Sequence, residues 1–499
     1  MSNKGTIVQL EDIEIDLFEY IDENSDYLKK EYLNIVLNIG NLKIKNQKFK
    51  HLLEYNGHSL WEMSLINEKN IYKNNYVFKT IKYLALKKIL NENLNKKTTI
   101  NFLEGDLANI LRKQFRSSKV VFQKSDLSLV DKIKCIIRKS SAYNYILFFY
   151  FFVKNCNFTK KSKINFQKKK IILFSYFTHY DTGKFFDGIF NPKQWSHLWG
   201  IIKPNSNFVQ LFIPSKNFSF FFQVKNFLLK RKIKDLDEKN FINNFIFFQY
   251  YKKVRVDFKK FKKKIGFFQI DEVFKINREF EFFYLINKEL FISSFSGHIL
   301  LQNLLWIRVF DDLMSEMPKH SWGIFLYENQ PWEKALITSW RKFNHGYLIG
   351  YSHTTINYWH LNYFNDPNYN LSEEFEKFNP DFIAVSSEIS KNFLLSQSIN
   401  PKKILEVEAL RYLWIADKKK QYNKKKKRKI LFLGDYKGTI NQKLIVILNQ
   451  LKSNLFNSGF EITFKPHPAT SVKNLDKDII QTSEDLEYLV NKFEYVVSS

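Results

Sequence analysis

A histidine between two prolines is the residue whose type and setting point most directly to chemistry. His467 lies in the run Lys465-Pro466-His467-Pro468, directly after the apolar residues 460–464. Each proline fixes its own φ angle and lacks a backbone N–H, so we expect the imidazole to be held in a rigid, extended turn. An imidazole there can donate a hydrogen bond to a phosphate or protonate a leaving phosphate oxygen, and the charge of Lys465 would assist it.

Glycine and serine residues in the same region offer further contacts for phosphate groups. Gly434 opens a flexible turn after the apolar residues 429–433, and Ser498 and Ser499 follow the apolar residues 495–497. A glycine allows backbone N–H groups to approach a phosphate closely. The turn lacks the Gly-x-Gly-x-x-Gly and Walker spacings, which disfavours a dehydrogenase or a P-loop NTPase. We therefore predict a donor nucleotide site formed by Lys465, His467, Ser498, Ser499 and Gly434.

Two carboxylates and a second histidine are the candidate catalytic groups. Glu328 ends an apolar segment and is our candidate general base, which would remove a proton from an acceptor hydroxyl so that its oxygen attacks an activated sugar carbon. His353 is the alternative base, or a group that orients the acceptor. Glu333 falls at the third position of a helix expected to begin at Pro331, where its carboxylate could instead bond back to the N-cap residue, Gln330.

These groups must be positioned by strands and helices that alternate along the last third of the chain. The expected strands cover residues 322–328, 347–352, 382–387, 429–433, 460–464 and 495–497, and the expected helices cover residues 331–344, 389–397, 441–455 and 484–492. Such alternation is typical of a parallel sheet with right-handed crossovers, and ligands bind at the carboxyl ends of its strands. We therefore predict an α/β fold with two Rossmann-like domains that face a cleft.

The charge pattern suggests where the domains begin and end. Residues 417–428 (DKKKQYNKKKKR) have no apolar face and are interpreted as an exposed basic linker. Residues 1–416 would then form an N-terminal acceptor-side α/β domain with a Phe- and Lys-rich insertion at about 216–289. Residues 429–499 would form a partial C-terminal Rossmann-like domain that binds the donor nucleotide. Because this domain stops at a strand, we expect the sequence to be a truncated fragment.

Composition excludes several classes of protein. With 499 residues, 44% of them hydrophobic, the chain is long and apolar enough for a globular protein of two or three domains. The net charge of +28 suits a polyanionic partner. However, Lys, Asn, Ile and Phe are all abundant while Gly and Pro are scarce, as in AT-rich genomes. The basic runs also lack a recognisable nucleic-acid-binding motif, so we expect no nucleic acid partner.

Cysteine content and the amino terminus indicate a cytoplasmic protein. Cys135 and Cys156 are too few for a disulfide framework and wrongly spaced for a zinc site, and the acidic residues 1–16 lack the apolar core of a signal peptide. The apolar residues 142–153 are too short to span a bilayer. They fit either a buried helix or strand, or a segment that contacts the cytoplasmic face of the membrane, where the flanking basic residues would suit anionic lipid.

The chain also resembles known bacterial proteins. Residues 327–364, together with residues 60–64 and 408–412, look like a bacterial family described as surface carbohydrate (O-antigen and capsule type) biosynthesis proteins. Separately, the His-Pro run and the serine pair are similar to motifs of bacterial sialyl- and polysialyltransferases of the GT-B fold, which contact the CMP part of the donor. The motif of two acids followed by glycine in those enzymes has no clean match here, which leaves the assignment of the base open. A similar His-Pro element occurs in CDP-glycerol phosphotransferases.

The residues and the resemblance together predict a GT-B-like, metal-independent glycosyltransferase of surface polysaccharide biosynthesis. Its donor would be a nucleotide-activated sugar, more specifically a CMP-activated acidic sugar. Its acceptor would be a glycan or a lipid-linked molecule at the inner face of the cytoplasmic membrane, and no cofactor or metal would be required. Two alternatives remain open: a CDP-polyol phosphotransferase of teichoic-acid type, and a non-enzymatic basic scaffold or nucleic-acid-binding protein.

Overall fold

The computed structural model consists of two compact units, Met1–Leu410 and Arg411–Ser499. The described residues are 6–11, 13–115, 120–125, 140–156, 166, 168–176, 191–192, 195–211, 241–246, 248–266, 270–413, 428–435, 438–467, 470, 472, 474–484, 486–489 and 492–498. The boundary falls shortly before the predicted basic linker, which lies almost entirely outside the described residues.

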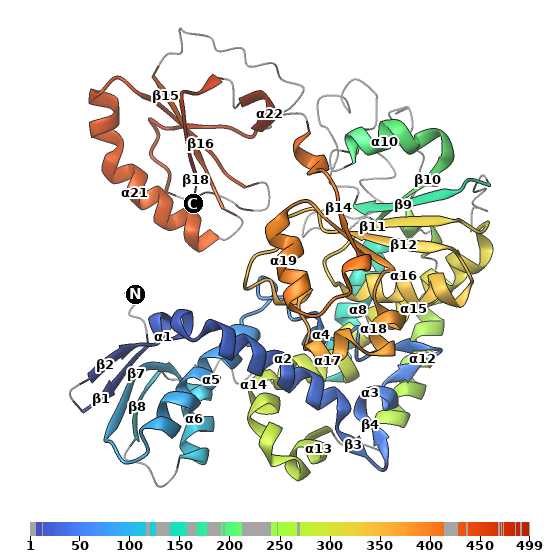
Figure 1. Cartoon of the computed structure of the whole chain (residues 1–499), viewed down its shortest axis with the longest axis horizontal. Helices are drawn as coiled ribbons and strands as arrows, with labels where there is room; N and C mark the ends of the chain where they lie inside the picture. Colours follow the sequence, from blue (N-terminus) through green and yellow to red (C-terminus); the bar gives the residue numbers. More distant parts are fainter. Residues whose placement is uncertain are drawn as a thin grey trace. The chain divides into compact units, whose positions relative to one another are not determined.

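The first unit begins with a small mixed sheet and the helices that cover it (Figure 1). Its strand order is β2-β1-β7-β8, where β1 is antiparallel to β2 and β7, and β7 is parallel to β8. The strands are β1 (Ile7–Leu10), β2 (Ile13–Asp16), β7 (Thr98–Glu104) and β8 (Val120–Ser125). The helices of this region are α1 (Leu17–Glu23), α2 (Ser25–Asn41), α3 (Phe49–Leu52), α4 (Leu65–Glu68), α5 (Tyr76–Glu92) and α6 (Gly105–Gln114). Two hairpins, β3–β4 (Lys43–Ile44, Gln47–Lys48) and β5–β6 (Glu54–Tyr55, His58–Ser59), flank α3.

A group of five helices joins this region to the main sheet of the first unit. The helices are α8 (Ser141–Asn155), α12 (Phe248–Gly266), α13 (Ile270–Ile276), α14 (Glu281–Ser296) and α15 (His298–Glu316). Helix α14 contacts α5 on one side and α15 on the other, and its buried phenylalanines belong to the same core as the main sheet. The described part of the predicted insertion, residues 241–246, 248–266 and 270–289, therefore contributes helices to the main core.

Six parallel strands form the main sheet, in the order β10-β9-β11-β12-β13-β14. They are β9 (Ile171–Tyr176), β10 (Ser206–Leu211), β11 (Trp322–Leu326), β12 (Tyr347–Tyr351), β13 (Phe382–Val385) and β14 (Ile404–Glu406). The associated helices are α10 (Ser196–Ile202), α16 (Pro331–Lys342), α17 (Pro367–Asn370), α18 (Glu373–Phe378) and α19 (Glu388–Ser396). Apolar runs such as that of β9 are buried on both faces, as expected for parallel strands covered by helices.

The second unit contains a smaller parallel sheet with strand order β17-β16-β15-β18. Its strands are β15 (Lys429–Leu433), β16 (Glu461–Lys465), β17 (Ile480–Gln481) and β18 (Tyr495–Ser498), and its helices are α21 (Gly438–Asn457) and α22 (Leu486–Leu489). Residues of β15, β16 and α21 form a separate core that includes Phe432, Leu448 and Phe464.

The prediction of an α/β fold with two Rossmann-like parallel sheets is confirmed. The arrangement of the two sheets across a cleft stays a prediction. Among the described residues, no single helix is long and apolar enough to cross a bilayer, whereas the bent pair Arg278–Ser296 and His298–Glu316 has that length and composition. The apolar residues 142–153 form part of helix α8, so this segment is a helix and not a strand, and its contact with a membrane stays a prediction.

Candidate functional site

Glu328 and His353 lie together at the carboxyl edge of the six-stranded sheet. Strands β11 and β12 pair in register up to Leu326 and Tyr351, so the residues that follow them emerge side by side. The Nε2 atom of His353 is 3.6 Å from a carboxylate oxygen of Glu328. The Glu328 side chain remains 30% exposed, whereas that of His353 is 8% exposed. The pair is therefore reachable from solvent through the carboxylate.

The backbone on both sides of Glu328 is fixed by other residues. Its N–H donates to both carboxylate oxygens of Glu333, at 3.0 and 3.2 Å, and its carbonyl accepts from the Asn362 amide at 3.0 Å. The next residue, Asn329, has a φ of 59°, which places it in the left-handed region. Asparagine tolerates this region better than most residues, so a sharp turn can form here. Glu328 is thus presented by a turn whose backbone is held at each end.

Glu333 makes a second contact besides the bond to the N-cap residue that its position predicts. Gln330 is the N-cap of α16, as the sequence predicts, and the Glu333 carboxylate accepts the N–H of Glu328 in addition to a backbone hydrogen bond from Gln330. The left-handed turn at Asn329 explains the added contact because it folds the preceding backbone over the first turn of the helix. Burial, followed by the nearby charge of Glu328, holds the pKa of Glu333 well above its ordinary value. Glu333 therefore has a structural contact, and any direct catalytic role for it stays a prediction.

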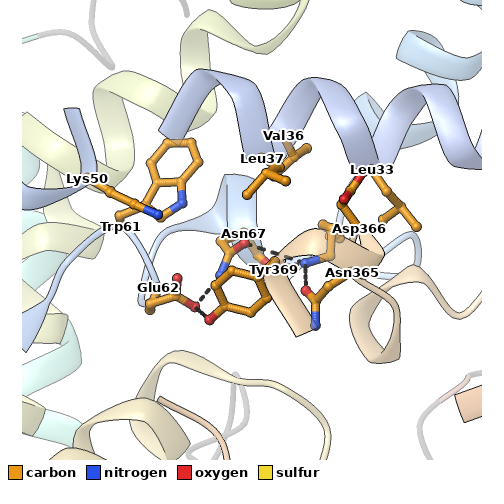
Figure 2. A pocket seen from close by; sticks show the side chains of 11 residues that line it. Leu33, Val36, Leu37, Lys50, Trp61, Glu62, Asn67, Asn365, Asp366 and Tyr369 are labelled. Atoms are coloured by element: carbon orange, nitrogen blue, oxygen red, sulfur yellow. Dashed lines mark hydrogen bonds between the residues drawn. The ribbon is translucent and has the colours of Figure 1, made fainter. Parts of the chain in front are cut away.

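The N-terminal segment of residues 62–69 reaches the same turn from far away in the sequence. The backbone carbonyl of Asn67 accepts hydrogen bonds from the Asn329 side chain at 3.3 Å and from the Lys69 ammonium at 2.8 Å. Figure 2 shows the Glu62 carboxylate accepting from the amide of Asn67, at 2.7 Å, and from the hydroxyl of Tyr369, at 2.8 Å. Residues 62–69 are therefore joined to the turn at Asn329 and to Tyr369 by buried polar contacts.

A small pocket adjoins these contacts beneath helix α2 (Figure 2). Apolar side chains of α2 line one side, and Glu62, Asn67 and Lys69 line the other. Its free space, about 20 Å³ for the centres of water-sized molecules, holds roughly one water. Burial lowers the pKa of Lys69 to about 7, and the ammonium also contacts Asn365 at 3.0 Å. The pocket is too small for a nucleotide sugar, so these residues support the turn that carries Glu328.

Glu68 is a carboxylate near Glu328 that the sequence analysis did not identify. It is almost fully buried and forms an ion pair with Lys73. Burial raises its pKa, Lys73 opposes this shift, and the charge of Glu328 adds to it. The sequence offers one local indication of a polar site here. Residues 65–69 are a short apolar segment that ends in an asparagine, a glutamate and a lysine. Without the fold, nothing connects that segment to residue 328.

In the second unit, four of the five predicted donor-site residues lie at the carboxyl edge of the small sheet. Leu433 of β15 pairs with Lys465 on one side and with Ser498 on the other, so these residues share one level of the sheet. The N–H of Gly434 donates to the carbonyl of Lys465 at 2.8 Å. His467 follows two residues after β16. Ser499 lies outside the described residues.

Asn441, in the first turn of α21, links the two loops that leave this edge. Its side-chain carbonyl accepts the N–H of Asp435 at 2.6 Å, and its NH₂ group donates to the carbonyl of Asp435 at 2.8 Å and to the hydroxyl of Thr470 at 3.0 Å. Thr470 in turn donates to the carbonyl of His467 through its N–H, at 2.9 Å, and its hydroxyl. One buried amide therefore fixes both loops, and the sequence analysis did not identify it.

The surroundings of His467 favour its neutral form. Burial is the main cause of its lowered pKa, the charges of Arg411 and Lys465 act in the same direction, and Asp435 opposes them. An anionic ligand at this edge would raise the pKa of His467 and favour its protonated form, because negative charge stabilises the imidazolium. The helix α21 also begins at this edge, and the N-terminus of a helix favours negative charge.

Comparison with known proteins leaves the family of the chain open. No protein-family model and no curated protein matches the sequence. Among solved structures, the chain is similar to a UDP-N-acetylglucosamine 2-epimerase from Rickettsia bellii, with 10% identity over 66% of this chain and 74% of that chain and a TM-score of 0.32. A likeness at this level identifies neither the reaction nor the ligand. The proposed function therefore depends on the residues described above.

Proposed function

We propose that the chain is a transferase that uses a nucleotide-activated sugar, with the donor nucleotide held at the carboxyl edge of the small sheet. The observation that carries this proposal is the convergence of Gly434, Lys465, His467 and Ser498 at one edge, next to the start of helix α21. The N-terminus of a helix, a cation, an imidazole and a hydroxyl are groups that would bind a pyrophosphate or phosphate without a metal ion.

Glu328 would serve as the general base that activates the acceptor hydroxyl. It combines a partly exposed carboxylate with a backbone held by hydrogen bonds, and His353 lies beside it. A general base needs an accessible carboxylate in a fixed position, and Glu328 is partly accessible to solvent and is held by its backbone contacts. His353 would orient the acceptor or replace Glu328 as the base.

The donor is proposed to be a CMP-activated acidic sugar and the acceptor a glycan or lipid-linked molecule. This choice rests on the similarity of the His-Pro and Ser-Ser motifs to those of sialyl- and polysialyltransferases. Transfer of a polyol phosphate from a CDP donor is the nearest alternative, because it would use the same edge with a similar His-Pro element.

Nucleotide binding by the full chain tests the proposal. We expect CMP to raise the melting temperature and His467→Ala to remove this rise. The matched control is His51→Ala, which changes a largely exposed histidine of the first unit and should leave the rise intact. Stronger stabilisation by CDP than by CMP would favour the phosphotransferase. No response to CMP, CDP or UDP would contradict both enzyme proposals.

A further inference from the structure

Helices α8 and α12 of the first unit form one continuous surface. Both pack against α15, and the ring of Tyr251 on α12 contacts Phe148 and Phe152 on α8, with ring centroids 5.6 and 5.4 Å apart. The guanidinium of Arg255 lies over the ring of Tyr145, 5.3 Å from its centroid. These contacts hold the two helices side by side, so side chains on their outer faces belong to the same surface.

Large apolar side chains are exposed on this surface. On α8, Ile146, Phe149 and Tyr150 are 65%, 47% and 54% exposed, and on α12, Phe248 and Val256 are 52% and 51% exposed. The three residues of α8 lie on one helical face because they are three and four positions apart. Single exposed apolar residues are common, but a group of them indicates a surface that contacts a partner. We call these five residues and the lysines named next the α8–α12 surface.

Positive charge lies beside the exposed apolar residues of α12. Lys252, Lys259 and Lys263 are exposed and follow Phe248 and Val256 at helical spacing, on the same face of α12. Asp257 is the single acidic residue within the described helices α8 and α12, and it is buried in an ion pair with Arg308. The two helices therefore supply no exposed carboxylate to balance the lysines.

We propose that the α8–α12 surface binds an anionic lipid bilayer. Lysines would contact the anionic headgroups, while Ile146, Phe149 and Tyr150 would enter the boundary between headgroups and acyl chains. An anionic bilayer therefore matches both the positive charge and the exposed apolar side chains of the surface. A nucleic acid duplex would use only the lysines, because its bases are stacked inside and its phosphate backbone offers no apolar region for Ile146, Phe149 and Tyr150. The proposal is independent of any transferase activity.

Flotation of the full chain with lipid vesicles tests the proposal. We expect binding to vesicles that contain phosphatidylglycerol, weak binding to pure phosphatidylcholine, and weakening by salt. Combined substitution Lys252→Gln, Lys259→Gln and Lys263→Gln should lower vesicle affinity roughly tenfold or more. Ile146→Ser with Tyr150→Ser should remove the binding that persists at high salt, and both side chains are exposed enough for the fold to tolerate the change.

Matched control variants distinguish binding by the α8–α12 surface from binding that depends only on the net positive charge of the chain. Lys30→Gln, Lys96→Gln and Lys97→Gln remove the same charge from other exposed positions, and Leu371→Ser removes an exposed apolar side chain elsewhere. These controls should keep vesicle binding. Equal loss in the controls, absence of flotation with anionic vesicles, or tight salt-sensitive binding to RNA without vesicle binding would each overturn the proposal. Circular dichroism confirms that each variant is folded.

Discussion

The carboxylate of Glu333 accepts the backbone N–H of Glu328, with distances of 3.0 and 3.2 Å to its two oxygens. The two glutamates are five residues apart in the sequence but differ in burial and in their contacts. Glu333 is fully buried and holds the turn, while the side chain of Glu328 is 30% exposed. Sequence position alone made both of them candidates for acid–base chemistry.

Glu333→Gln should change how stability depends on pH. Because the pKa of Glu333 is raised above 4.5, the folded protein keeps a proton that the unfolded chain releases. The contribution of Glu333 to the free energy of unfolding is complete at pH values below its pKa in the unfolded chain. It is lost as the pH rises through its pKa in the folded protein. Glutamine does not titrate, so the wild type should lose stability relative to the variant as the pH rises. Urea denaturation from about pH 5 to about pH 8 measures this.

Glu333→Ala provides the contrast for this prediction. It leaves the Glu328 N–H without its acceptor and creates a cavity, so we expect a loss of about 3 kcal/mol in the free energy of unfolding. An unchanged pH dependence in Glu333→Gln would show that Glu333 is ionised in the folded protein.

Glu328→Gln should stop transfer and leave the fold and nucleotide binding intact. Removal of a general base lowers the turnover rate by roughly 10²–10⁴-fold. Nucleotide release from CMP-N-acetylneuraminate, with a glycan acceptor, measures the rate, and CMP binding is measured separately. Glu92→Gln, at a side chain that is 53% exposed, is the control and should be fully active. If Glu328→Gln unfolds the protein, the residue has a structural role instead.

Gly434→Ala should weaken nucleotide binding. An added Cβ would lie 2.9 Å from the side-chain oxygen of Asn441, 3.2 Å from the Cα of Pro466 and 3.3 Å from the backbone N of His467. Two of these atoms are backbone, so the His-Pro loop must move, and we expect CMP affinity to fall by roughly tenfold, a free energy of about 1.4 kcal/mol. Gly200→Ala adds a Cβ into open space and should bind CMP normally. Isothermal titration calorimetry compares the two, and equal affinities would contradict the prediction.

Asn441→Ala should release both loops and raise the pKa of His467 toward 6.5. The lowered pKa depends mainly on burial, and loosening the loop increases solvent access to the imidazole. NMR titration of the His467 ring measures this without any nucleotide. Gln450→Ala, at an exposed position of the same helix, should leave the titration unchanged. An unaltered His467 pKa in Asn441→Ala would show that the loop is held by other contacts.

Local pattern was sufficient for the elements that carry the candidate groups. The expected strand at residues 429–433 matches β15, and the helix expected from Pro331 matches the start of α16. Apolar runs, a proline at the first helical position and polar residues after each strand are all local signals. They were enough to place Glu328 and His353 at one sheet edge, because parallel strands bring their carboxyl ends together.

Contacts between distant segments could not be predicted in this way. Asn67, Glu62 and Lys69 support the turn at Asn329 through hydrogen bonds, yet nothing in their own segment indicates that partner. Asn441 was included in an expected helix, but its link to Thr470 depends on how two loops approach each other in space. Such pairings follow from tertiary packing, so only the fold identifies them.

The hydrogen bond between Asn329 and Asn67 also has a consequence for how the protein folds. Its two residues are 262 positions apart, and the bond between Tyr369 and Glu62 spans 307. Closing such long loops is entropically costly and slows folding. The turn that presents Glu328 can therefore reach its final geometry only after residues 62–69 have docked. During synthesis, residues 62–69 cannot make these contacts until more than half of the chain has been made. Expression of the six-stranded sheet without residues 62–69 should therefore give an aggregation-prone product.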